Sequence, residues 1–218
     1  MFPPTEKTDP FGRKLHPDID IVKVRIEDVF RDRRSTLLVL PAISREALLI
    51  GQRLYGCCIA GGAPLALYTG DVHKIKDWDL FFHDHPAMSN AVTELNRFGF
   101  TYVNSTNWSA TYKKSGVVVQ IVNWRLYRSI EEVFKSFDFS VCCFAVDGPN
   151  LVFTKQAAKD VEKGELNFLH TDDLIMCLKR IARYGQKGFM PSTECIKEII
   201  KKAGGVDVDV IEDNGGCS

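Results

Sequence analysis

The sequence predicts an α/β (α+β) fold, in which a mixed central β-sheet is flanked by helices and followed by a short C-terminal helical segment. Three observations lead to this prediction. Short apolar runs typical of buried strands recur along the chain, as at 57–60 and 117–122. Before the first of these runs and between the two, residues 44–56 and 85–98 carry apolar side chains at helical spacing. From Lys155 onward the pattern turns helical.

Local patterns predict the individual elements. Residues 19–30 alternate apolar and charged side chains, which allows a strand turning into a short helix. The predicted strands that follow are 57–60, 76–82, 100–103, 110–113, 117–122, 139–146 and 151–154. The predicted helices are 44–56, 64–70, 85–98, 129–134, 171–184 and 191–200. Ser44 and Thr171 are the expected N-caps of their helices, because a hydroxyl accepts from backbone N–H groups of the first turn.

The order of these elements suggests four regions. Residues 1–43 are expected to form an N-terminal arm, 44–154 a head that contains the sheet, and 155–203 the helical segment. The acidic, glycine-containing residues 204–218 are expected to form a flexible tail. No internal repeat is visible.

Composition limits the function classes. The 28 basic and 28 acidic residues give zero net charge, so bulk charge gives no case for tight nonspecific nucleic-acid binding, although a local basic face remains open. No signal peptide or membrane-length apolar run is visible, so we expect no membrane partner. The seven cysteines include two vicinal pairs in predicted strands, whose side chains point opposite ways. They are expected to be reduced thiols of a cytoplasmic protein.

The strongest indication of function is Asp77-Trp78-Asp79, at the start of a predicted apolar strand. Side chains at i and i+2 of a strand project from one face, roughly 7 Å apart along the chain. Two carboxylates in this arrangement can ligate Mg²⁺ or Mn²⁺ that is shared with the phosphates of a nucleotide. An exposed edge strand would also explain the acids, but Leu80 and Phe81 make the segment apolar, and buried carboxylates need partners.

A glycine pair, Gly61-Gly62, precedes the acids by one helix-length spacer. Glycines can bring backbone N–H groups against a phosphate where a Cβ would collide. A tight turn explains a lone glycine pair equally well, so the prediction of a phosphate cradle depends on its distance from the Asp-x-Asp pair.

With these motifs the sequence resembles the DNA polymerase β-like nucleotidyltransferase superfamily, and within it the head of tRNA nucleotidyltransferases (CCA-adding enzymes) and poly(A) polymerases. Two later segments add to the resemblance. Phe137-Asp138-Phe139-Ser140-Val141 is similar to a family motif that helps to hold the nucleotide. Residues 180–184, followed by Gly188-Phe189, are similar to the neck helix that closes over the base. The chain also resembles nucleotidyltransferase-like proteins of viruses and phages, which would place it in the host cytoplasm.

The chain departs from the family pattern at two places. Ala63-Pro64-Leu65 follows the glycines, where the family has Val-Arg-Asp after a small residue, so that arginine is missing. Gln120 occupies the position of the third carboxylate found in many members. An amide can offer a carbonyl oxygen to a metal but cannot act as a general base.

The resemblance implies a wider set of nucleotide-binding residues, each with a simpler alternative. Gln120 is either a core amide or part of the site, and Asp138 either an exposed residue or a contact to the sugar or triphosphate. Arg125 is either surface charge or a phosphate contact. Arg180 and Arg183 belong to a basic helix face with Lys179 and Lys187. Such a face is either solvated or a track for a triphosphate or an RNA backbone.

Two hypotheses from different function classes remain open. In the first, the protein is a nucleotidyltransferase with Asp77 and Asp79 as metal ligands, and it transfers a nucleoside monophosphate with release of pyrophosphate. The acceptor could be an RNA end, a protein hydroxyl or a small molecule. In the second, a degenerate head binds a nucleotide or a partner protein without chemistry. Gln120 and the missing arginine favour the second hypothesis, whereas the paired aspartates favour the first. Oligomeric state cannot be predicted.

Overall fold

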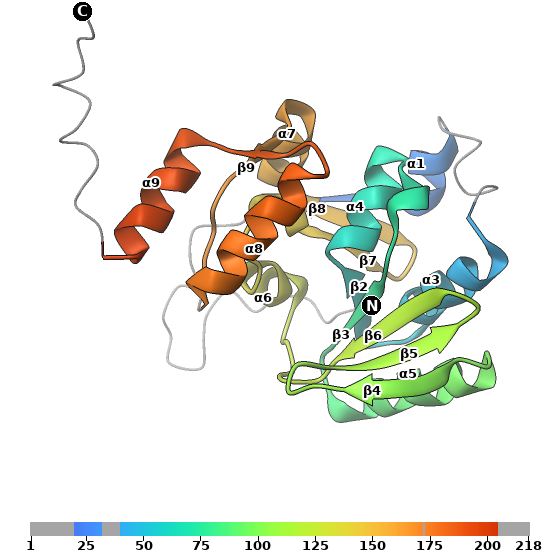
Figure 1. Cartoon of the computed structure of the whole chain (residues 1–218). Coiled ribbons are helices and arrows are strands. Elements are labelled where there is room, and N and C mark those ends of the chain that lie inside the picture. Colours follow the sequence, from blue (N-terminus) through green and yellow to red (C-terminus); the bar gives the residue numbers. More distant parts are fainter. Residues whose placement is uncertain (1–19, 32–39, 172, 205–218) are drawn as a thin grey trace, which may run out of the picture.

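The computed structural model describes residues 20–31, 40–171 and 173–204. Its centre is an eight-stranded mixed sheet with the order β1-β8-β7-β2-β3-β6-β5-β4 (Figure 1). Helices pack against this sheet, and helices α8 and α9 follow it near the C-terminus. The predicted fold class is therefore confirmed.

The strands of the large sheet are β1 (Ile21–Arg25), β2 (Cys57–Ala60), β3 (Trp78–Phe82), β4 (Thr101–Ser105), β5 (Ser109–Lys114), β6 (Val117–Val122), β7 (Phe144–Asp147) and β8 (Asn150–Thr154). The α-helices are α1 (Ile26–Arg31), α3 (Ala42–Arg53), α4 (Gly62–Thr69), α5 (His85–Arg97), α6 (Ile130–Lys135), α7 (Lys155–Lys163), α8 (Leu174–Gly185) and α9 (Thr193–Lys202). Two 3₁₀ turns, η1 (Val72–Lys74) and η2 (Ser140–Cys142), and a small parallel pair, β9 (Glu165–Leu166) with β10 (Met190–Pro191), complete the described elements.

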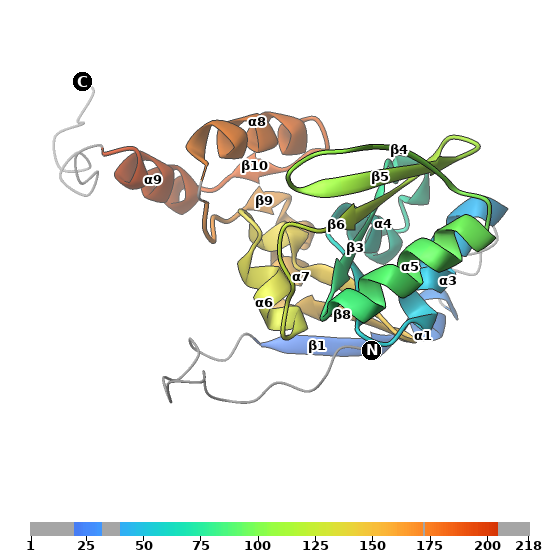
Figure 2. The same ribbon diagram turned by 90° about the horizontal axis from the view of Figure 1, so that it is seen from below.

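The two faces of the central strands differ in what covers them. α3 and α5 contact each other and β2 and β3, on the side of the sheet away from α8 (Figure 2). Trp78 and Leu80 of β3 are buried, and so is Ile59 of β2. Gly51 lets α3 lie close to this layer, because a Cβ there would collide with the Ile59 side chain. Strand alternation places Asp79 on the opposite face.

Many predicted elements are confirmed. The strands at 57–60 and 117–122 have the predicted bounds, and α4 ends at Gly70 in the left-handed conformation. The hairpin turn at Lys114-Ser115-Gly116 is also confirmed, with φ of 45° at Ser115 and 85° at Gly116. The predicted strand and short helix in residues 19–30 correspond to β1 and α1, and β1 pairs with β8 at the edge of the sheet. Residues 1–19 and 32–39 of the predicted N-terminal arm and residues 205–218 of the predicted tail lie outside the described residues.

The predicted strand at 139–146 is wrong in its first half. Residues Ser140–Cys142 form the turn η2, and only Phe144–Asp147 forms β7. The Ser140 hydroxyl donates to the carboxylate of the buried Asp160, and the Ser140 N–H donates to the Asn167 carbonyl at 3.0 Å. These partners follow later in the chain, and they draw the backbone out of the sheet.

Both predicted helix caps are also corrected. α3 begins two residues before Ser44, with Pro41 at its N-cap, and Ser44 is buried inside the helix. α8 has Asp173 at its N-cap, whose side chain accepts from the Met176 N–H, while Thr171 instead accepts from the Asp173 N–H. In the C-terminal region, β9 and β10 interrupt the predicted helical pattern.

The remaining predictions concern thiols and membranes. The six cysteines that the structure describes are free, and five of them are buried. Burial raises the pKa of Cys57 to about 12, so this thiol stays protonated and unreactive. Among the described helices, none combines the length and the apolar character needed to cross a membrane.

Candidate functional site

The two aspartates of the Asp-x-Asp motif stand at the start of β3. Asp77 directly precedes the strand and Asp79 is its second residue. Their neighbour Trp78 is 1% exposed and faces the helix-covered side, which leaves both aspartates on the other face. Both are partly exposed. The fold thus places two carboxylates on one accessible face of the sheet.

Gln120 lies beside Asp79 in the parallel strand β6. The register of β3 and β6 pairs Trp78 with Val119 and Asp79 with Gln120. Directly paired residues of neighbouring strands share a face, so the Gln120 amide stands next to the Asp79 carboxylate. On the other side of Asp79, β2 contributes the paired residue Ala60. The register therefore sets Gln120 beside the acidic pair.

The environment of Asp79 favours its protonated form in the absence of a cation. Burial, and after it the negative charge of Asp77, raise the pKa of Asp79 to about 8. A cation between the two carboxylates would reverse both effects. Within residues 20–31, 40–171 and 173–204, no group of three or more His, Cys, Asp or Glu residues could hold a metal ion. Any ion at this pair would take its further ligands from Gln120, water or a substrate.

The glycine pair forms the turn from β2 into α4. Gly61 is the N-cap of α4, with φ 89° and ψ −129°, a conformation that L side chains rarely adopt. Its N–H donates to the Phe144 carbonyl at 2.9 Å and is not available to a ligand. A Cβ on Gly62 would meet no atom within 4 Å. The first turn of a helix leaves N–H groups without helical acceptors, so the N–H groups of Gly62 and Ala63 are the ones that a ligand at this turn could use.

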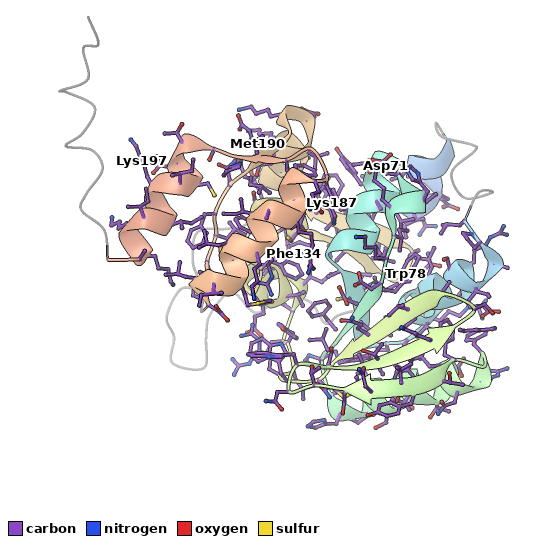
Figure 3. All side chains as sticks on the ribbon, viewed as in Figure 1. Asp71, Trp78, Phe134, Lys187, Met190 and Lys197 are labelled. Carbon is purple, nitrogen blue, oxygen red and sulfur yellow. The ribbon has the colours of Figure 1, made fainter. Side chains whose placement is uncertain are left out.

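Lys187 joins this site from the C-terminal segment, just past the end of α8 (Figure 3). It lines, together with Gly62, a cavity of about 220 Å³ between α4 and the region around Gly164. Its ammonium lies 4.8 Å from the centroid of the Tyr184 ring. Burial lowers the pKa of Lys187, and the charge of Asp77 opposes this effect. No other described residue forms an ion pair or hydrogen bond with the ammonium, which leaves it available to an anion.

Asp138 and Arg180 form an ion pair with each other. Asp138 is 6% exposed, and its carboxylate accepts a hydrogen bond of 2.5 Å from the Arg180 guanidinium. On the same helix, the Tyr184 hydroxyl lies 3.0 Å from the Cys142 sulfur. These contacts hold α8 against the head. Arg183 is exposed and forms no ion pair within the described part of the chain.

Arg125 is not brought to the acidic pair. It lies beyond the far end of β6, where the backbone N–H of Tyr127 donates to the carbonyl of Phe82 at the end of β3. Its guanidinium lies over the rings of Trp124 and Tyr127, with centroid distances of 4.9 and 4.5 Å. Of the predicted residues, the structure therefore groups Asp77, Asp79, Gln120 and Gly62. It also adds Lys187, for which the sequence offered only its place on a basic helix face.

This arrangement of sheet, glycine turn and paired acids is that of a nucleotidyltransferase head, and comparison with solved structures supports the fold. A CCA-adding enzyme in complex with CTP superposes with a TM-score of 0.62 and 20% identity, over 89% of this chain and 49% of that one. The Thermotoga maritima CCA-adding enzyme complexed with tRNA has a TM-score of 0.60 and 20% identity, over 83% and 46%. At this identity the similarity establishes the fold alone.

The family is established by sequence. The model of the Gabija anti-defense 2 family matches residues 31–164, so the chain belongs to this family. Gabija anti-defense 2 of Bacillus phage SPbetaL7 is 23% identical over 152 residues, which are 70% of this chain and 34% of that protein. The chain thus spans about a third of the length of this phage relative.

Proposed function

We propose that the protein is a metal-dependent nucleotidyltransferase that transfers a nucleoside monophosphate from a nucleoside triphosphate to an acceptor hydroxyl. The observation that carries this proposal is the pair Asp77 and Asp79, which stands at the start of β3 on one accessible face of the sheet. The glycine turn directly follows Ala60, the partner of Asp79, and the Lys187 ammonium interacts with the charge of Asp77, so both could bind phosphates beside the carboxylates. The solved neighbours bound to CTP and ATP support a nucleoside triphosphate as the ligand.

The donor set fits Mg²⁺ or Mn²⁺. Carboxylate and amide oxygens are ligands that these hard cations accept, and such sites commonly complete their coordination with substrate phosphates. Asp77, Asp79 and the Gln120 carbonyl would hold the ion or ions. A bound cation would supply charge neutralisation at the α-phosphate and lower the pKa of the attacking hydroxyl.

Side chains and backbone groups of the protein would bind the phosphates and position the reacting groups. The N–H groups of Gly62 and Ala63 would bind oxygens of the β- and γ-phosphates, and the Lys187 ammonium would neutralise their charge. The acceptor oxygen forms the new bond to the α-phosphorus while the bond to the β-phosphate oxygen breaks, so that pyrophosphate leaves. Gln120 cannot accept the proton of the attacking hydroxyl. That proton therefore passes to an aspartate of the pair or to solvent.

A second candidate function is binding without chemistry. The amide at Gln120 favours it, because it replaces a group able to act as a base. The family name states an anti-defense role, which either function could serve. Because a solved neighbour binds tRNA and the relative is a phage protein, we infer an RNA acceptor and the host cytoplasm as the place of action.

Label transfer tests the enzymatic proposal. The protein is incubated with each α-labelled nucleoside triphosphate and Mg²⁺ or Mn²⁺, in the presence of RNA and of cell lysate. We expect covalent labelling of an acceptor by the wild type. Asp77→Asn with Asp79→Asn should abolish it and leave the fold intact, because both changes are nearly isosteric and remove repulsion. Equal labelling by the double variant would remove these aspartates from the mechanism.

A further inference from the structure

Two exposed tryptophans form a patch in the loops beyond the end of β6, away from the end of β3 that carries the acidic pair. Trp108 lies in the β4–β5 turn and Trp124 in the loop after β6, and their side chains are 63% and 42% exposed. The two rings meet edge to face, with centroids 5.4 Å apart. Large aromatic side chains are costly to leave in water, and a pair that the fold holds at the surface indicates a binding function.

Aromatic contacts connect this patch to the face that carries the acids. Phe81 lies two residues after Asp79 on β3 and therefore shares its face. Its ring packs against Tyr127 at 5.5 Å, and Tyr127 packs against Trp124 at 6.4 Å. The tryptophans thus stand on the same side of the sheet as Asp79, toward the other end of β3.

Hydrogen bonds hold the two loops in place. The Asn123 N–H donates to the Trp108 carbonyl at 3.1 Å and ties one loop to the other. The Thr106 hydroxyl accepts from the N–H groups of Trp108 and Ser109, at 3.1 and 3.2 Å. Rings that are ordered before binding lose little conformational entropy when a flat ligand stacks on them.

Arg125 adds positive charge to the patch. Its guanidinium lies over Trp124 and Tyr127 and donates to the Glu132 carbonyl at 3.3 Å. A guanidinium carries five N–H donors, so most remain for an anion. Arg128 adds a second exposed cation three residues later. Aromatic faces beside an arginine match the bases and phosphates of an unpaired nucleic-acid strand.

We propose that Trp108, Trp124 and Arg125 form a binding site for unpaired bases of a single-stranded nucleic acid. The site would hold the acceptor strand on the face where its end can reach Asp77 and Asp79, and this role rests on the proposed function. The binding itself requires only the patch. Stacking accepts any base, so the site selects for the unpaired state more than for a sequence.

Strand binding is measured by fluorescence anisotropy with short labelled oligonucleotides at low salt, as single-stranded RNA, single-stranded DNA and duplex. We expect single-stranded RNA, single-stranded DNA or both to bind more tightly than the duplex. Trp108→Ala should weaken this binding roughly fivefold or more, and Trp108→Phe should weaken it less. Arg125→Gln should reduce the salt dependence of strand affinity by an amount that corresponds to about one phosphate contact. Trp108 is largely exposed, so its variants should fold.

The matched control is Tyr102→Ala, since Tyr102 is an exposed aromatic of the same hairpin that pairs with Tyr112 on the helix-covered face. Its strand affinity should match the wild type. Intrinsic fluorescence gives a second measurement, because Trp78 is 1% exposed and quenching by a strand would report Trp108 and Trp124. Wild-type affinity in Trp108→Ala, or equal binding of duplex, would overturn the proposal. So would absence of strand binding, which would leave the patch to a protein partner.

The same variants separate this proposal from the proposed function. Asp77→Asn with Asp79→Asn should keep strand affinity while it loses transfer. Trp108→Ala should keep the rise in melting temperature caused by a nucleoside triphosphate with Mg²⁺. Transfer that persists while Trp108→Ala binds strands like the wild type would overturn the patch proposal alone.

Discussion

Asp79 connects the electrostatics of the site to the stability of the protein. Burial and the neighbouring Asp77 raise its pKa from 3.8 to about 8 when no cation is bound. The folded state therefore keeps a proton that the unfolded chain releases near pH 4. The contribution of this group to the free energy of unfolding is therefore fully present below about pH 4 and is lost as pH rises through about 8.

The first prediction concerns this pH dependence. In EDTA, the free energy of unfolding of the wild type relative to Asp79→Asn should fall between pH 5 and pH 9, because only the wild type must lose a proton from a carboxyl whose pKa the fold has raised. Denaturant unfolding at a series of pH values measures the difference. Parallel pH profiles of the two proteins would show that Asp79 titrates normally.

Gln120 carries the second prediction at this scale. Its register beside Asp79 means that Gln120→Glu places a third carboxylate against the pair with little change in volume. Without metal, this variant should be destabilised by about 1–2 kcal/mol, because the crowded carboxylates repel. Mg²⁺ should reduce the difference in stability between Gln120→Glu and the wild type, since a third carboxylate strengthens cation binding.

Melting of both proteins across a Mg²⁺ series decides this question. A stability gap that narrows with Mg²⁺ places Gln120 in the metal site. Curves that stay parallel would make Gln120 a structural amide. Transfer activity of Gln120→Glu gives a separate measure of whether the missing carboxylate limits the reaction.

At the scale of elements, local patterns predict those parts of the fold that depend on local contacts. β2 and β6 are apolar runs bounded by turns, and α5 carries its own N-cap at Asp84. η2 could not be predicted, because the partners of Ser140 lie at Asp160 and Asn167, 20 and 27 residues away. β9 and β10 are two residues long each, too short for a periodic pattern.

The start of α4 allows a test of the phosphate cradle. A Cβ on Gly62 would meet no protein atom within 4 Å, so the folded protein should tolerate Gly62→Val. A branched side chain would nevertheless fill the space that a phosphate needs. We expect Gly62→Val to lose the rise in melting temperature that a nucleoside triphosphate with Mg²⁺ causes in the wild type.

Gly62→Ala is the matched control, with a smaller side chain and a higher helix propensity than glycine. Its ligand-free melting temperature should equal or exceed that of the wild type, and its response to nucleotide should be intermediate. Gly61 is unsuitable for this purpose, since its φ of 89° would strain any substituted side chain. A full response in Gly62→Val would move the phosphates away from this turn.

At the scale of the whole molecule, the proposed site unites the head with the C-terminal segment. The pair Asp138–Arg180 and the contact between Cys142 and Tyr184 hold α8 against the head, and they bring Lys187 to the cavity that Gly62 lines. Periodicity placed Lys187 on a basic helix face, but the packing of that helix depends on contacts between residues 42 positions apart. The sequence could therefore predict the paired acids Asp77 and Asp79, but not that the Lys187 ammonium joins their site.

Lys187→Met tests whether the C-terminal segment contributes to nucleotide binding. The substitution keeps most of the apolar stem and removes the charge, so nucleotide binding should weaken about tenfold while the melting temperature without ligand changes little. Arg183→Met is the matched control, because Arg183 is an exposed cation in the last turn of α8, four residues before Lys187, and forms no ion pair within the described residues. Equal losses in both variants would indicate general electrostatic attraction instead of a defined contact.

The central claim is that Asp77 and Asp79 bind a nucleotide through a metal ion. Isothermal titration with a non-hydrolysable nucleoside triphosphate analogue, in Mg²⁺ and in EDTA, measures this directly. We predict that the wild type binds the analogue at least about tenfold more tightly with Mg²⁺, and that Asp77→Asn with Asp79→Asn binds it equally weakly in both conditions. The claim would be contradicted by a wild type whose affinity ignores Mg²⁺, or by a double variant that keeps the wild-type dependence.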